Sequence, residues 1–158
     1  RMPDPVLRAT DLGELVEGAL DLVRFPGVEL HFTRPDAPVV ASVDRGQIRQ
    51  VLTNLVKNAS EAMPAGGVVR IRLSRFPATP GTPVRLEIAD NGPGIPAEVR
   101  ERLFHPYFTT KPEGSGLGLA IVQGIVTAHG GRIEVEPAES GGALFRILLP
   151  GESTPTDG

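Results

Sequence analysis

Apolar residues recur at helical spacing in three stretches of the chain, and between these stretches apolar and polar residues alternate as in half-buried strands. The helical stretches cover residues 11–23, 44–63 and 117–128, and a shorter helix is expected near residues 98–103. The predicted strands cover residues 28–33, 39–43, 69–73, 84–88, 133–135 and 145–149. Strands that arrive in pairs between helices predict an α+β two-layer sandwich, with a mixed or antiparallel sheet and helices on one face.

Two aspartates mark where the first two long helices begin. Asp11 precedes Glu14 in a capping-box pattern, and Asp44 stands three residues before Gln47.

The prolines near the N-terminus and the polar C-terminus are typical of segments outside a domain. We therefore expect a linker from a missing upstream region, one domain and a disordered tail, over residues 1–10, 11–150 and 151–158.

Composition excludes several classes of protein. The chain has 158 residues, of which 40% are hydrophobic and 22% charged, and this is the make-up of one globular domain. The net charge of −3 offers no broad basic surface for nucleic acid, and the absence of cysteine excludes disulfides and thiolate metal sites. No apolar run approaches the roughly 20 residues that span a bilayer.

A carboxylate on the core side of a strand is the most informative single group. From Val84 to Asp90 the apolar side chains fall on even numbers, so Asp90 shares the face of Leu86 and Ile88. A buried carboxylate is costly unless a donor bonds to it, and residues 91–94 (Asn-Gly-Pro-Gly) form a turn with little side chain around it. Two interpretations stay open here. The carboxylate binds the exocyclic amine of a purine, or it caps the following turn.

The second long helix carries two asparagines on its polar stripe. Asn54 and Asn58 are four residues apart and share one helix face, with Lys57 and Glu61 beside them. Asparagine is a poor helix former, and two stacked amides can present neutral oxygens to a hard cation such as Mg²⁺. The alternative is that both side chains are simply solvated, which is the commoner fate of a single asparagine but less so of a pair.

The third long helix opens on a glycine-rich run, Gly114-Ser115-Gly116-Leu117-Gly118-Leu119. Backbone N–H groups at a helix start attract anions, and Lys111 just upstream adds a cation for phosphate. The run lacks the third glycine of a dinucleotide fingerprint and the Gly-Lys-Ser/Thr ending of a Walker loop. A glycine-rich mobile loop without a ligand is the alternative.

The three histidines carry no predicted chemistry. His31 lies on a strand at a position of exposed parity, His105 precedes a proline and His129 ends a helix. They match no zinc spacing, so surface or capping positions are expected for them.

These motifs together resemble those of the ATP-binding catalytic domain of bacterial sensor histidine kinases, in the superfamily shared with gyrase-type and Hsp90-type ATPases. The resemblance covers residues 11–150. It lies in an N box, a first glycine box, an F box of the nitrogen-regulation type, a second glycine box and two closing strands, at residues 54–59, 90–95, 104–111, 114–119, 130–133 and 141–150. It implies the Bergerat fold, which is a two-layer α+β sandwich with a mixed, mostly antiparallel sheet, helices on one face and a flexible lid over ATP.

The resemblance also implies a role for each matching residue. Asp90 would hold the adenine amine, Asn58 would bind the Mg²⁺ that bridges the phosphates, and Asn54 and Lys57 would complete the catalytic set on the phosphate side. The implied nucleotide-binding set is Asn54, Asn58, Asp90, Gly92, Gly94, Ile95, Lys111, Gly114, Ser115, Gly116, Leu117 and Gly118. The implied lid, residues 104–115, includes Phe104, Tyr107, Phe108, Thr109 and Thr110.

Departures from the family's pattern refine the expected activity. ATPases of the superfamily carry a water-activating glutamate four residues before the Mg²⁺ asparagine, whereas this chain has Asn54, whose amide has no useful basicity. Transfer of the phosphoryl group to another acceptor is therefore implied, rather than hydrolysis. Ala143 stands where the family usually has a threonine near the adenine, and none of the histidines has the setting of the family's phosphoacceptor.

The resemblance therefore predicts a domain that binds Mg²⁺ and ATP and donates the γ-phosphoryl group to a histidine on a separate dimerisation and phosphoacceptor hairpin. A response regulator receiver domain would be the downstream partner. We expect a cytoplasmic and monomeric domain without nucleic-acid or membrane contacts, whether or not the parent protein is membrane-anchored. The alternatives are a serine/threonine kinase of the anti-sigma-factor type, a non-enzymatic nucleotide-sensing module and, third, a hydrolysing ATPase.

Overall fold

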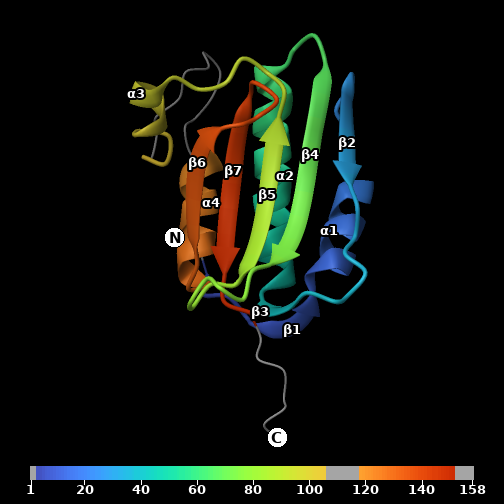
Figure 1. Cartoon of the computed structure of the whole chain (residues 1–158), viewed down its shortest axis with the longest axis vertical. Coiled ribbons are helices and arrows are strands. Elements are labelled where there is room, and N and C mark those ends of the chain that lie inside the picture. Colours follow the sequence, from blue (N-terminus) through green and yellow to red (C-terminus); the bar gives the residue numbers. More distant parts are fainter. Residues whose placement is uncertain (1–2, 106–117, 152–158) are drawn as a thin grey trace, which may run out of the picture.

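The computed structural model of the chain describes residues 3–105 and 118–151. In these ranges three helices lie on one face of a five-stranded sheet (Figure 1). The elements are β1 (Arg8–Asp11), α1 (Leu12–Asp21), β2 (Val28–Phe32), β3 (Val40–Val43), α2 (Arg45–Ala62), β4 (Gly67–Arg75), β5 (Val84–Asp90), α3 (Ala97–Arg100), α4 (Gly118–Ala128), β6 (Arg132–Pro137) and β7 (Ala143–Leu149). None of these helices is both long and apolar enough to cross a membrane.

The sheet is mixed and mostly antiparallel, as the family resemblance implies. Its strand order is β2-β4-β5-β7-β6, and β2 and β4 form the parallel pair while the other neighbours are antiparallel. The consecutive strands β2 and β3 do not pair with each other. β3 instead pairs with β1 in a separate two-stranded sheet.

The expected linker over residues 1–10 is wrong at its C-terminal end. Residues 8–10 belong to β1, in which Arg8 lies opposite Val43 and Thr10 opposite Ala41. Thr10 is buried and its hydroxyl donates a hydrogen bond to the Arg8 carbonyl oxygen. Backbone pairing with a distant strand leaves no periodic signal in a four-residue segment, so the sequence pattern alone did not indicate this strand.

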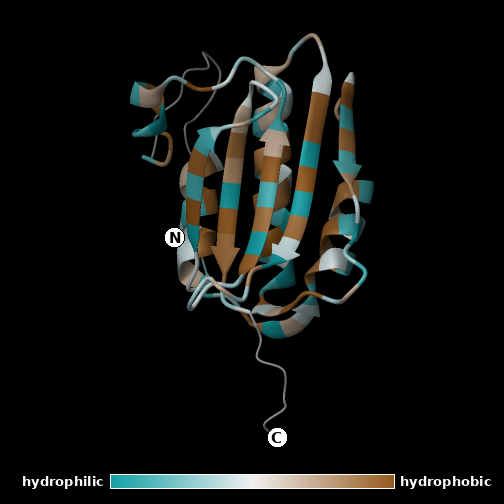
Figure 2. Cartoon of the chain, viewed as in Figure 1, coloured by the Kyte–Doolittle hydropathy of each residue, from teal (hydrophilic) through white to brown (hydrophobic). Residues whose placement is uncertain are grey.

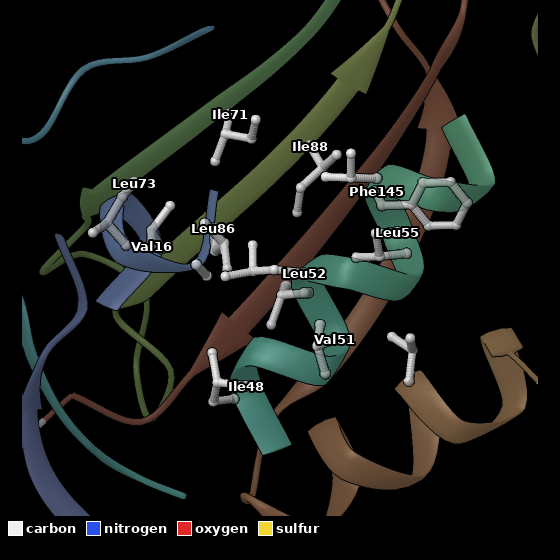
Figure 3. Close-up of a cluster of buried hydrophobic side chains, with 14 of the residues drawn as sticks. Val16, Ile48, Val51, Leu52, Leu55, Ile71, Leu73, Leu86, Ile88 and Phe145 are labelled. Carbon is white, nitrogen blue, oxygen red and sulfur yellow. The ribbon is translucent and has the colours of Figure 1, made fainter. Parts of the chain in front are cut away.

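The core lies between the sheet and the helices α1, α2 and α4. Along β4 and β5 hydrophobic and hydrophilic residues alternate (Figure 2), which places one set against the helices, while β7 is hydrophobic except for Arg146. In Figure 3 the helix side chains face those of the strands, and the labelled residues are Val16, Ile48, Val51, Leu52, Leu55, Ile71, Leu73, Leu86, Ile88 and Phe145. Burial of each such side chain stabilises the fold by about 1.5–3 kcal/mol.

The helix boundaries follow the predicted caps. The Asp11 carboxylate accepts hydrogen bonds from the backbone N–H groups of residues 13 and 14, and Asp44 accepts one from Gln47 N at 3.1 Å. Beyond α4, Gly130 has a positive φ of 77°, which ends the helix at little steric cost. The short helix is α3, which covers residues 97–100 and gives way to turns by residue 101.

The outer face of the sheet carries a charge cluster centred on Arg146 of β7. Its guanidinium donates to Glu87 at 2.9 Å, to Glu134 at 3.3 Å and to Glu136 at 2.9 Å. Glu87 and Glu134 are the register partners of Arg146 on the two neighbouring strands, so the pairing of the strands creates the cluster. The hydrogen bonds from Arg146 hold the pKa of Glu136 below its usual range, and those to the glutamates raise the pKa of Arg146.

Candidate functional site

Asp90 is the last residue of β5 and lies on the core face, as the alternation predicts. It is 6% exposed, and its Oδ1 accepts hydrogen bonds from Gly92 N at 2.9 Å and Ala143 N at 3.3 Å. The turn-capping interpretation is therefore confirmed. Within the described part of the chain both bonds end on Oδ1, so Oδ2 keeps its lone pairs for another donor. Capping thus uses one of the two oxygens of this carboxylate.

The turn between β6 and β7 packs against Asp90, and the sequence reasoning missed this contact. The Ser140 hydroxyl donates a hydrogen bond to the Asp90 carbonyl oxygen at 2.8 Å. A Cβ on Gly142 would overlap both that oxygen and Asp90 Oδ1, so only glycine fits at this position. The glycine pair at 141 and 142 was the available signal, but it is equally typical of a hairpin turn with no other role.

The end of α2 reaches the turn that follows Asp90. Met63 is 5% exposed, and its Cγ would lie 2.9 Å from a Cβ on Gly92. A Cβ on Gly67 would overlap the Met63 sulfur as well. Asn91 Oδ1 accepts a hydrogen bond from Val68 N at 2.9 Å, which ties the turn to the start of β4. Glycines at 67 and 92 therefore let the helix of the two asparagines approach the buried carboxylate closely.

The asparagines of α2 lie on its partly exposed side, as the sequence predicts. Asn54 and Asn58 are half-buried and Lys57 is exposed. Asn54 Nδ2 donates a hydrogen bond to the carbonyl oxygen of Gly118, the first residue of α4, at 3.3 Å. The structure thus brings together residues from the N box and the second glycine box. A contact between residues 54 and 118 could not be predicted from spacing within either motif.

Two further expected site residues bracket the segment that follows the first glycine box. Ile95 is partly buried against the core, and its carbonyl oxygen accepts a hydrogen bond from Arg100 Nη1 at 2.8 Å. Phe104, expected in the lid, packs edge-on against Phe145 with ring centroids 6.4 Å apart. The described part of the expected lid is therefore attached to the core. The other expected lid and phosphate residues lie outside the described residues: Tyr107, Phe108, Thr109, Thr110, Lys111, Gly114, Ser115, Gly116 and Leu117.

The histidines occupy three different environments. His31 is exposed on β2 beside Glu29, at 3.5 Å, and His105 is exposed. His129 is only 6% exposed, so a surface position is wrong for it, while a capping position is confirmed. Its Nδ1 lies 2.8 Å from the carbonyl oxygen of Ile125 in the last turn of α4, and its Nε2 accepts a hydrogen bond from Asp44 N at 3.0 Å.

A cavity lies elsewhere, between the C-terminal part of α1 and β2. It has a volume of about 540 Å³, and its lining includes Leu20, Phe25 and Leu30. β2 is separated from β5 by β4, so this cavity is remote from Asp90. None of the residues singled out by the sequence motifs lines it.

Comparison with known proteins agrees with this arrangement. Residues 43–153 match the family described as histidine kinase-, DNA gyrase B- and HSP90-like ATPases. The chain is 41% identical over 167 residues to nitrogen regulation protein NtrY of Azorhizobium caulinodans. This alignment covers 99% of the chain and 21% of NtrY. It is 39% identical over 155 residues to sensor histidine kinase ZraS of Escherichia coli (strain K12). This alignment covers 96% of the chain and 32% of ZraS.

Solved structures show the same fold. Full-length ShkA in complex with AMPPNP superposes with a TM-score of 0.80 and is 29% identical in sequence. The match covers 98% of this chain and 33% of the ShkA chain. The histidine kinase ThkA, in complex with response regulator protein TrrA, superposes with a TM-score of 0.77 and is 32% identical in sequence. The match covers 94% of this chain and 42% of the matched chain. The chain spans 21% and 32% of the lengths of NtrY and ZraS. The chain therefore belongs to the family of histidine kinase-, DNA gyrase B- and HSP90-like ATPases, and its α+β fold is that of the catalytic domains of sensor histidine kinases.

Proposed function

We propose that this domain binds ATP with Mg²⁺ and passes the γ-phosphoryl group to a histidine on another domain. The observation that carries the proposal is the Asp90 carboxylate, which is 6% exposed and has one oxygen held by two backbone N–H groups. Its second oxygen is an acceptor for the exocyclic amine of adenine, and a buried charge-assisted hydrogen bond of this kind is strong and selective. Gly92 and Gly94 remove side chains from the turn beside it.

The chemistry of the donor set fits Mg²⁺. The described ranges hold no group of three or more histidine, cysteine, aspartate or glutamate side chains arranged for a metal. Asn58 offers an amide oxygen from the partly exposed side of α2, and Mg²⁺ is commonly bound by few protein oxygens together with substrate phosphates. When bound, the ion would neutralise the charge that develops on the phosphates. Asn58 would hold it, and Lys57, exposed on the same helix, would add positive charge.

Asn54 favours transfer over hydrolysis for two reasons. Its amide is not a base, so it cannot activate water. Its Nδ2 also donates to Gly118 O at 3.3 Å, a bond that a glutamate at this position could not make because a carboxylate has no proton to donate at neutral pH. The residue in the usual place of the water-activating base thus holds the start of α4.

The acceptor histidine and the downstream partner belong to the proposal as well. None of the three histidines lies next to Asp90 in the described contacts, and the relatives NtrY and ZraS are three to five times longer than this chain. We therefore place the acceptor on a helical hairpin outside the chain. ThkA was solved in complex with a response regulator, which supports a receiver domain as the partner that takes the phosphoryl group onward.

The test is transfer of labelled phosphate from ATP to a separately supplied phosphoacceptor hairpin. We expect transfer only when the hairpin is present, and the product should be acid-labile, as phosphohistidine is. An acid-stable phosphoprotein would instead indicate a serine/threonine kinase. Tight ATP binding without transfer to any hairpin would indicate a nucleotide-sensing module, and steady release of free phosphate by the lone domain would indicate an ATPase.

The site assignment is tested by calorimetry of ATP binding. Asp90→Asn replaces an acceptor oxygen with a donor, and Asn58→Ala removes the amide oxygen assigned to Mg²⁺. Each is expected to weaken binding at least tenfold, which corresponds to about 1.4 kcal/mol. Asp21→Asn, at the exposed end of α1, is the matched control and should bind as the unmodified chain does. Unchanged affinity in both site variants would contradict the assignment.

A further inference from the structure

His129 is a buried polar residue that the proposed chemistry does not use. Both of its ring nitrogens are engaged, Nδ1 with Ile125 O at 2.8 Å and Nε2 with Asp44 N at 3.0 Å. A backbone N–H can only donate, so Nε2 must be the acceptor. The ring proton is therefore on Nδ1, where it is donated to the Ile125 carbonyl. The geometry assigns one neutral tautomer to His129.

Asp44, on the other side of this bond, is the junction of three segments. Its N–H meets His129, its Oδ1 caps α2 through Gln47 N, and its Oδ2 accepts a hydrogen bond from Val6 N at 2.9 Å. Gln47 in turn donates through Nε2 to the Pro3 carbonyl oxygen at 3.0 Å. The N-terminal segment, the start of α2 and the end of α4 are thus fixed to one another at a single residue.

The same two helices are bonded a second time, about three turns further along α2. Asn54 Nδ2 donates to Gly118 O, so the start of α4 is held by the middle of α2. Ten residues separate Asp44 from Asn54 and eleven separate Gly118 from His129. At 1.5 Å per residue both spans are about 15–17 Å, so the two bonds lie at the two ends of antiparallel stretches of similar length, one in α2 and one in α4. α2 and α4 lie beside each other behind the sheet (Figure 1).

We propose that His129 is a positioning residue for the nucleotide site. By accepting from Asp44 N it sets the axial register of α4 against α2, and this register decides whether Gly118 meets Asn54. Gly118 at the start of α4 and the asparagines of α2 belong to the proposed phosphate side, so the inference rests on the proposed function. An apolar side chain of the same size would leave the Asp44 N–H without its acceptor, and the helices would slide to satisfy it.

The experiment compares His129→Phe with His129→Gln. Phenylalanine fills the space of the ring without an acceptor, whereas glutamine keeps a carbonyl oxygen that can accept from Asp44 N. Leu20→Ala is the control for a general loss of stability, because Leu20 is 8% exposed in α1, on the other flank of α2 (Figure 1). The free energy of unfolding is measured by urea denaturation for all three variants, alongside ATP affinity by calorimetry.

We expect His129→Phe to weaken ATP binding about tenfold, which is within the range of coupling that remote packing residues exert, and His129→Gln to restore most of it. Leu20→Ala should lose stability without this loss of affinity. The positioning role is overturned if His129→Phe binds ATP as tightly as the unmodified chain. It is also overturned if Leu20→Ala loses as much ATP affinity as His129→Phe for the same loss in the free energy of unfolding.

Two NMR readouts separate this inference from the proposed function, because neither needs a nucleotide. The imidazole ¹⁵N signals of the unmodified chain should show the proton on Nδ1, and a proton on Nε2 would overturn the assignment. The side-chain amide signal of Asn54 should shift in His129→Phe, about 15 Å away, and stay in place in Leu20→Ala. If the unmodified chain binds no ATP but both NMR results hold, the proposed function fails and the helix register remains set by His129.

Discussion

At the scale of single residues, the proposed site depends on contacts that leave no room for a side chain. A Cβ on Gly142 would overlap the backbone and the carboxylate of Asp90, and a Cβ on Gly92 would crowd Met63 at the end of α2. These glycines are required by close approach rather than by a turn alone. The position of the Asp90 carboxylate is therefore set by three segments that are distant in sequence: its own turn, the end of α2 and the β6–β7 turn.

Gly142→Ala tests this close approach. The new methyl group would overlap Asp90, so we expect a loss of about 1–3 kcal/mol in the free energy of unfolding and a parallel loss of ATP affinity. Gly18→Ala is the matched control, because in the described part of the chain a Cβ on Gly18, on the exposed side of α1, would meet no atom within 4 Å outside the helix's own backbone. That variant should gain up to about 1 kcal/mol, since alanine is the better helix former. Urea denaturation and calorimetry measure both effects.

At the scale of elements, the start of α2 depends on the charge of Asp44. The hydrogen bond from Val6 N, and after it that from Gln47 N, holds the pKa of Asp44 below its usual range. A carboxyl group whose folded-state pKa is depressed stabilises the fold above the ordinary aspartate pKa of about 3.9, and this contribution is lost as the pH falls through the depressed value. We therefore expect acid sensitivity from this cap.

The comparison with Asp44→Asn isolates that contribution. Asparagine is a good helix cap but carries no charge. Unfolding of both proteins is followed by urea denaturation between pH 7 and pH 2. The stability advantage of the unmodified chain over the variant should be constant near neutral pH and should shrink below about pH 4. An advantage that stays constant down to pH 2 would mean that the charge of Asp44 does not contribute to stability.

The Arg146 cluster stabilises the pairing of β5, β6 and β7. Arg146 and Glu87 are 17% and 15% exposed in their side chains, so their pair is more protected than an ordinary surface pair. Arg146→Ala would leave three neighbouring carboxylates without their shared cation and should cost about 1–3 kcal/mol in the free energy of unfolding. Arg132→Ala removes a pair with Glu134 that is 59% exposed on the arginine side and should cost less than about 1 kcal/mol. Equal costs would contradict the role of the cluster.

At the scale of the whole molecule, the fold includes residues that precede its first helix. β1 pairs with β3, and the segment before β1 bonds to α2 through Val6 and Pro3. The N-terminal segment thus joins the sandwich at the end of α2 that lies farthest from its asparagines. A domain upstream of this segment would be attached to the helix that carries Asn54 and Asn58.

Deletion of residues 1–10 tests whether this segment belongs to the domain. The truncated chain loses the β1 pairing and the bonds to Asp44 and Gln47, and at about 1 kcal/mol for each hydrogen bond it should be roughly 2–4 kcal/mol less stable. Deletion of residues 1–5 keeps β1 and the Val6 bond and should cost about 1 kcal/mol or less. Thermal or urea denaturation measures both. A chain that begins at residue 11 with undiminished stability would restore the boundary expected from sequence.

Much of the fold was predictable because its signals are local. The alternation in β4 and β5 and the caps at Asp11 and Asp44 depend on neighbours within a few residues, and they indicated helices, strands and the burial of Asp90. The family resemblance likewise depended on short motifs. β1 was not predictable, because a strand of four residues is recognised only by its distant partner.

Sequence by itself determined most of the apolar core positions and the burial of Asp90 among them, because period and composition are properties of consecutive residues. Only the tertiary structure decided what those polar residues touch. The Ser140 and Gly142 contacts with Asp90, the bond from Asn54 to Gly118 and the bond from Asp44 to His129 join residues 50 to 85 positions apart. Such contacts arise from the order of strands and the register of helices, which depend on how the whole core packs and which no local pattern encodes.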